Sequence, residues 1–199
     1  MANLDLLNSH NVLLRRNDRK SQNSFSLDYD RTSAKSLRGQ IVGLLFTSIE
    51  SELNSDIDDM IQFTDIMKEF YTAVREAGRS FEVVYIPYNM RSWDEIAEEE
   101  DCLKERDPGW VVVNTADDHS VIPKLCEKYD VNCAPRLVII EENGDPLVLD
   151  ATQTVLDASH DEDYLKAYDG MLSGVNRSYA TDSKYPDTSG ERSKSCSVL

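Results

Sequence analysis

Two apolar segments separated by a helical pattern constrain the fold of this chain most. Residues 41–46 and 81–86 are almost uninterrupted apolar runs, which is typical of strands buried on both faces of a sheet. Between them, apolar residues recur at helical spacing over residues 57–74, and Gly78 follows as a helix stop signal. A strand, a helix and a second strand in this order predict a parallel pair joined by a right-handed crossover.

The second half of the chain predicts an antiparallel pair. Asn143-Gly144 separates apolar residues 136–140 from residues 146–149, which is a strong hairpin signal. We expect short strands at 12–14, on an edge of the sheet, and at 110–113, helices after Ser92, after Asp117 or Asp118, and at 164–172, and a loop at 17–36. Together these elements predict an α/β domain with a mixed central sheet and helices on both faces.

The charge of the chain argues against nucleic acid as a ligand. The 199 residues include 37 acidic and 21 basic ones, a formal net charge of −16, and this acidity is concentrated in residues 41–169. Such a surface repels phosphate backbones. No apolar run is long enough to span a bilayer and the first residues lack a signal-peptide pattern, so we expect a cytoplasmic protein. In that compartment the cysteines are expected to be free thiols; they are Cys102, Cys126, Cys133 and Cys196.

Nothing in the chain predicts a metal or a cofactor. His10, His119 and His160 are scattered, and none has a cysteine or carboxylate at the spacing of a metal site. The alternating Asn54, Asp56 and Asp58 lack the glycine and the distal glutamate of a calcium loop. We therefore interpret these acidic residues as the N-terminal cap of the following helix.

The residues around Pro135 resemble the thioredoxin family. The segment Val131-Asn132-Cys133-Ala134-Pro135-Arg136-Leu137-Val138 is similar to the one in which a cis-proline precedes a core strand of that family. Further similarities, at residues 13–16, 36–40, 63–71, 81–85, 108–110 and 124–131, narrow the resemblance to the tryparedoxin and nucleoredoxin branch. The resemblance covers about residues 12–172 and implies a three-layer α/β/α thioredoxin-like fold. Residues 1–11 then form an N-terminal lead, and the composition of residues 173–199 predicts a disordered tail.

The redox motif of this family is missing from the chain. Its chemistry needs Cys-x-x-Cys at the start of the first long helix, where the helix dipole favours the attacking thiolate. Alignment on residues 63–71 places the two cysteine positions at Ile57 and Met60, whereas alignment from Phe46 places them at Ser51 and Asn54. Neither register contains a cysteine, and the chain has no Cys-x-x-Cys anywhere. Dithiol exchange by the mechanism of the family is therefore excluded.

Two hypotheses on function remain. The first is a redox-inactive interaction or adaptor module, in which a groove flanked by Ile57, Met60, Ala134 and Pro135 binds an extended segment of a protein partner, as the resemblance implies. The second is a thiol-disulfide oxidoreductase that uses a single thiol, Cys133, together with an external thiol. We expect Cys126 to pack as a small apolar residue.

The last four residues, Cys196-Ser197-Val198-Leu199, match a C-a-a-X box. A leucine in the last position indicates geranylgeranylation of Cys196. A single lipid gives only marginal anchoring, so we expect reversible, peripheral attachment to a membrane.

Overall fold

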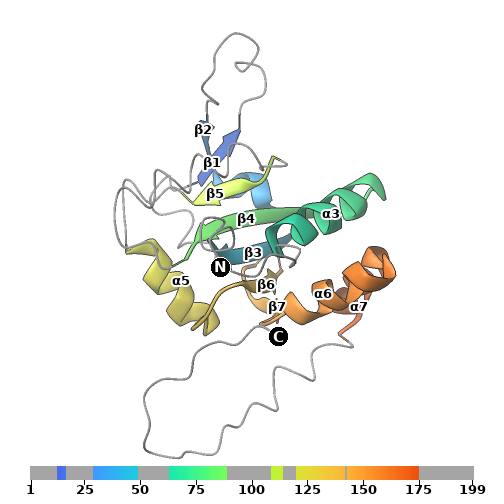
Figure 1. Cartoon of the computed structure of the whole chain (residues 1–199). Coiled ribbons are helices and arrows are strands. Elements are labelled where there is room, and N and C mark those ends of the chain that lie inside the picture. The colour runs from blue at the N-terminus through green and yellow to red at the C-terminus, as the bar shows by residue number, and fades with distance from the viewer. Residues whose placement is uncertain are drawn as a thin grey trace, which may run out of the picture.

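A seven-stranded mixed sheet is the centre of the computed structural model, which describes residues 13–16, 29–48, 63–88, 109–113, 120–141 and 143–174 (Figure 1). Along the sheet the strands of this described part are ordered β2-β1-β5-β4-β3-β6-β7. Their bounds are β1 (Leu13–Arg16), β2 (Tyr29–Thr32), β3 (Ile41–Thr47), β4 (Phe81–Pro87), β5 (Val111–Val113), β6 (Arg136–Ile140) and β7 (Pro146–Val148).

The predicted strand-helix-strand unit is confirmed. Strand β3 pairs with β4 in parallel, from Ile41 opposite Phe81 to Thr47 opposite Pro87, and α3 (Phe63–Glu76) connects them. Gly78 follows the helix with a φ of 73°, a left-handed conformation that glycine adopts without strain. The expected start of this helix, before Phe63, lies outside the described residues.

The predicted hairpin is confirmed as well. Strands β6 and β7 pair in antiparallel fashion, and β6 also pairs antiparallel to β3. In the turn, the side-chain oxygen of Asn143 accepts a hydrogen bond from the backbone N–H of Asp145 at 2.8 Å, and Gly144 has a φ of 79°. The Tyr129 hydroxyl donates to the carbonyl of Gly144 at 3.0 Å, which attaches the turn to the preceding helix.

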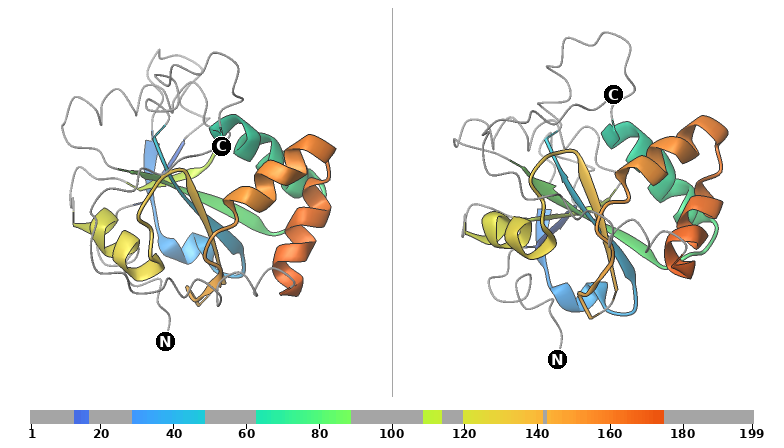
Figure 2. Two further views of the ribbon diagram at one scale, coloured as in Figure 1. Left: turned by 60° about the horizontal axis from the view of Figure 1, so that its bottom comes forward. Right: turned by 90° about the horizontal axis from the view of Figure 1, so that it is seen from below.

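Helices cover both faces of the sheet and give three layers (Figure 2). One face carries α3, α6 (Thr152–Asp161) and α7 (Tyr164–Ser173), and the other carries α5 (Val121–Tyr129) and the short 3-10 helix η2 (Ala34–Leu37). Because alternate strand residues point to opposite faces, Leu45 joins the first core cluster and Leu44 the second.

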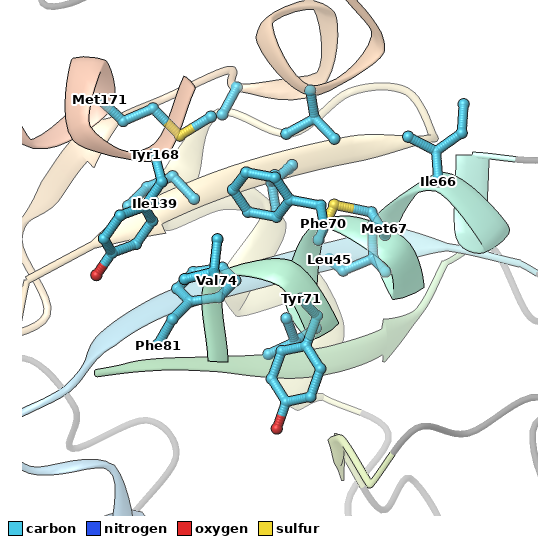
Figure 3. Packing of buried hydrophobic residues seen from close by; sticks show 14 of the residues in the cluster. Leu45, Ile66, Met67, Phe70, Tyr71, Val74, Phe81, Ile139, Tyr168 and Met171 are labelled. Atoms are coloured by element: carbon cyan, nitrogen blue, oxygen red, sulfur yellow. The ribbon is translucent and has the colours of Figure 1, made fainter. Parts of the chain in front are cut away.

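Aromatic side chains from α3, β4 and α7 lie among aliphatic ones in the core under α3 (Figure 3). Phe70 contacts Phe81 edge-on, with ring centroids 5.6 Å apart, and Phe81 contacts Tyr168 of α7 in the same manner. Gly43, in the middle of β3, makes room for this packing, because a Cβ atom there would lie 3.0 Å from Cζ of Phe81 and 3.2 Å from Cδ1 of Leu137. The aromatic layer thus needs a glycine at this point of the sheet.

Three sequence predictions need correction. The first strand is not on an edge, because β1 lies between β2 and β5, and part of the expected loop at 17–36 forms β2 and η2. The strand β2 has no apolar alternation and is held by backbone pairing to β1.

Helix α6 was not predicted, since only Val155 and Ala158 of its residues are buried. Helix α5 has Ser120 at its N-cap, so neither Asp117 nor Asp118 caps it. The expected helix after Ser92 lies outside the described residues.

Candidate functional site: the loop that ends in a cis-proline

The peptide bond between Ala134 and Pro135 is cis, as the resemblance to the thioredoxin family implies, and β6 begins at the next residue. Strand β6 pairs with β3 so that Arg136 lies opposite Phe46, near the carboxyl end of β3. The carboxyl end of β4 lies at the same edge, because Thr47 is opposite Pro87 and the backbone N–H of Tyr88 donates to the carbonyl of Thr47 at 3.0 Å. The cis-proline thus lies where two parallel core strands end.

The loop before β6 is anchored at both ends and partly exposed between them. Val131 is buried at its start, and the backbone N–H of this residue donates to the carbonyl of Cys126 at 2.9 Å. Leu137 is buried on the other side of the loop. Residues 133–136 are partly exposed.

A fixed guanidinium group lies beside the loop. One terminal nitrogen of Arg136, Nη1, contacts Oδ2 of Asp150 at 2.6 Å, and the other, Nη2, donates to Sγ of Cys133 at 3.5 Å. Oδ1 of Asp150 in turn accepts a hydrogen bond from the backbone N–H of Thr152 at 3.0 Å. Because the hydroxyl of Thr152 accepts from the backbone N–H of Leu137 at 3.0 Å, the start of α6 is attached to the start of β6. Asp150 therefore holds Arg136 against the sulfur.

Sequence reasoning did not find this arrangement. Arg136 and Asp150 are fourteen residues apart, with a hairpin between them, and no motif links them. The one available signal was a basic residue directly after the proline of the family segment. The ion pair between Arg136 and Asp150 forms only because the hairpin brings the start of α6 back to the start of β6.

Cys133 is disulfide-bonded. The expectation that all four cysteines are free thiols is therefore wrong for this residue. Cys126, in contrast, is free and packs against the core cluster beneath α5, as predicted. Burial is the main cause that raises the pKa of the Cys126 thiol above its ordinary value.

The structure does not describe the other predicted site residues on the far side of the groove and at the end of the chain. Ile57, Met60 and Cys196 lie outside the described residues, so one wall of the expected groove, that of Ala134 and Pro135, is described. Within the described ranges, no three histidine, cysteine or acidic side chains are grouped so that they could hold a metal ion. The helices in the same ranges are too short or too polar to cross a membrane.

A central mixed sheet, helices on both faces and a cis-proline before β6 define a thioredoxin-like fold. A family model described as Thioredoxin-like matches residues 39–145, which is more than half of the chain. The protein therefore belongs to the thioredoxin-like family.

Solved structures share this fold. Tryparedoxin from Trypanosoma brucei superposes with a TM-score of 0.55 at 20% identity, over 82% of this chain and 94% of that protein. A thioredoxin from Wuchereria bancrofti gives a TM-score of 0.52 at 23% identity, over 75% of this chain and 87% of the other. Tryparedoxin II from C. fasciculata gives 0.51 at 21% identity, over 70% and 82% of the two chains. These similarities show that the chain shares its fold with tryparedoxins and with a thioredoxin.

Proposed function

We propose that this protein is a redox-inactive interaction module that binds an extended segment of a protein partner beside Pro135. One combination carries the proposal. The chain keeps the family fold with the cis Ala134–Pro135 bond at the end of the core strands, yet its sequence contains no Cys-x-x-Cys. Since the dithiol is what attacks a substrate disulfide, binding is the part of the family function for which the residues remain.

The partly exposed loop supports this role. Residues 133–136 lead into β6 near the point where β3 ends at Thr47, and buried Val131 and Leu137 fix the two ends of the loop in the core. A loop held in this way needs little ordering when a peptide binds, which lowers the entropic cost of association. The acidic net charge of −16 favours a partner segment of basic character.

The first arm of the test is an insulin-reduction assay with dithiothreitol. We expect the purified protein to give the same rate as dithiothreitol alone, because the chain has no Cys-x-x-Cys pair to carry out repeated turnover. Cys133→Ser is the control variant and should give an identical curve, and a thioredoxin serves as the positive control. Turnover that depends on Cys133 would overturn the proposal.

The second arm measures binding, with a displayed library of random peptides as the probe. Peptides selected on the protein should lose affinity for Ala134→Arg by at least about tenfold, since a large charged side chain in the loop obstructs the groove. Leu165→Arg is the matched control, because Leu165 is 40% exposed on α7 and its replacement should change nothing. Peptides that bind Ala134→Arg equally well would place binding elsewhere.

A second candidate function has one observation in its favour. Cys133 carries a disulfide two residues before the cis-proline, so the loop does hold a sulfur capable of exchange. A thiol-disulfide oxidoreductase that uses Cys133 with an external thiol would need to reduce a protein disulfide repeatedly. The insulin assay above separates the two functions.

For a protein that ends at Leu199, we further propose geranylgeranylation of Cys196 and reversible membrane attachment. Mass spectrometry of the C-terminal peptide from the native cell should show a geranylgeranyl thioether on Cys196 and loss of Ser197, Val198 and Leu199. Cys196→Ser is the control and should move the protein fully into the cytosolic fraction. A native peptide that still ends in Ser-Val-Leu, with an unmodified cysteine, would contradict the lipidation.

A further inference from the structure

We propose that Arg136 selects the segment that binds beside Pro135, by donating a hydrogen bond to an acidic side chain of that segment. This inference rests on the proposed interaction module and adds the chemistry of its partner, which is an extended segment with one aspartate or glutamate opposite the loop. It depends on the weak acceptor that one nitrogen of the guanidinium contacts, and on the carboxylate that holds the other nitrogen.

One terminal nitrogen of Arg136 is bonded to a weak acceptor. Nη2 donates to Sγ of Cys133 at 3.5 Å, and sulfur accepts hydrogen bonds only weakly. A carboxylate oxygen at the same nitrogen would form a charge-assisted hydrogen bond, which is roughly twice as strong as one between neutral groups. A partner that offers such an oxygen therefore gains more from this nitrogen than the sulfur provides.

Arg136 lies at the place where the segment is proposed to bind. It directly follows Pro135, is the first residue of β6, and closes the partly exposed loop at residues 133–136. Because Nη2 contacts Cys133, the guanidinium lies beside this loop. The side chain of Arg136 is 20% exposed, so water screens a contact with it less than a contact with a fully exposed arginine.

Asp150 is a positioning residue for this contact. Its Oδ2 accepts a hydrogen bond from Nη1 of Arg136 at 2.6 Å, and its Oδ1 accepts one from the backbone N–H of Thr152 at 3.0 Å. The guanidinium is thus held in place before a partner arrives. A donor that is already fixed loses little conformational entropy on binding, and this favours the affinity for the segment.

The net charge of the chain acts on the partner at longer range than Arg136 does. A charge of −16 attracts a segment that is basic as a whole. The contact with Arg136 acts at hydrogen-bond distance and concerns a single residue of that segment. The two effects together predict a pattern in which one aspartate or glutamate is flanked by lysine or arginine.

The experiment compares two forms of one peptide. It starts from library peptides that bind the full chain and lose affinity for Ala134→Arg, and these peptides should share an aspartate or glutamate at one position. A synthetic peptide of this kind, and its amide form with asparagine or glutamine at that position, are titrated against each protein variant by fluorescence anisotropy. The unmodified chain should bind the acidic form about tenfold more tightly, and Arg136→Gln should bind both forms equally.

Arg79→Gln is the matched control. Arg79 also forms an ion pair with an aspartate, with Nη2 at 2.9 Å from Oδ2 of Asp169, but it precedes β4 at the end of the sheet opposite to Pro135. This variant should keep the tenfold ratio. Because the ratio compares two peptides on the same protein sample, an inactive fraction in one variant does not change it.

Failure of this inference can be told apart from failure of the interaction module. Peptides that lose affinity for Ala134→Arg but share no acidic residue, or a ratio that persists in Arg136→Gln, would exclude the role of Arg136 and leave the interaction module intact. A ratio that Arg79→Gln also abolishes would assign the preference to overall charge and would exclude that role as well. A library that yields no peptide sensitive to Ala134→Arg would overturn the interaction module and this inference with it.

Discussion

Phe70→Ala should lower the free energy of unfolding by about 3–5 kcal/mol. Phe70 is fully buried in α3, and its ring contacts Phe81 of β4 and Tyr164 of α7, with centroids 5.6 and 6.0 Å apart. Truncation removes these contacts and leaves a cavity between α3, α7 and the sheet. The folded state then loses both the dispersion contacts of the ring and the free energy gained by removing the ring from water. Urea unfolding followed by circular dichroism at 222 nm measures the change.

The matched control for this variant is Leu165→Ala. Leu165 is an apolar residue of α7 that is 40% exposed, and its truncation should change the free energy of unfolding by no more than about 0.5 kcal/mol. A domain of this size has a total stability of roughly 5–15 kcal/mol, so Phe70→Ala alone should remove a large part of it. A loss at Phe70 no greater than that at Leu165 would mean that α3 does not pack on the sheet as described.

Gly43→Ala should be the second most damaging change, with a loss of about 1–3 kcal/mol in the free energy of unfolding. The added Cβ would lie 3.0 Å from Cζ of Phe81 and 3.2 Å from Cδ1 of Leu137, and both side chains are fully buried. Neither the ring of Phe81 nor the side chain of Leu137 can move away without displacing its neighbours, because protein interiors are close-packed. Thermal and urea unfolding of the purified variant give the measurement.

Gly170→Ala is also a glycine-to-alanine substitution, but it should raise the free energy of unfolding instead of lowering it. Gly170 lies inside α7, and nothing is within 4 Å of a Cβ built on it. Alanine there should stabilise the protein by about 0.5–1 kcal/mol, since it restricts the unfolded chain and favours the helix. If both alanine variants lose stability to the same extent, steric crowding at Gly43 is not the cause.

The part of the site that depends on the local sequence was predicted well. The cis-proline segment, the hairpin at Asn143-Gly144 and the packing role of Cys126 are all confirmed. Each depends on residues that are close together in the chain, where turn chemistry and apolar periodicity act directly. The groove residues Ile57 and Met60 stay predictions, because they lie outside the described part.

The contacts that give the site its chemistry were not predictable in this way. A buried carboxylate provides another example: Glu82 interrupts an apolar strand and accepts hydrogen bonds from the Tyr71 hydroxyl and the N–H of Val83, both at 3.2 Å. The sequence shows only an acidic residue in a strand. Glu82 is buried and hydrogen-bonded because α3 lies over β4, and the residue pattern of the strand does not reveal this packing.

The sequence by itself determined the class of this protein. Strand and helix periods and turn residues are local properties, and they predict an α/β domain with a mixed sheet. The resemblance of the segment around Pro135 adds the thioredoxin-like family, which the family model over residues 39–145 confirms, and the sequence shows that its Cys-x-x-Cys pair is missing. Tertiary structure decided that Arg136 reaches both Asp150 and Cys133, and that β1 lies inside the sheet. The physical reason is distance along the chain: such contacts form only after a hairpin or a crossover has brought remote segments together, and no short-range propensity encodes them.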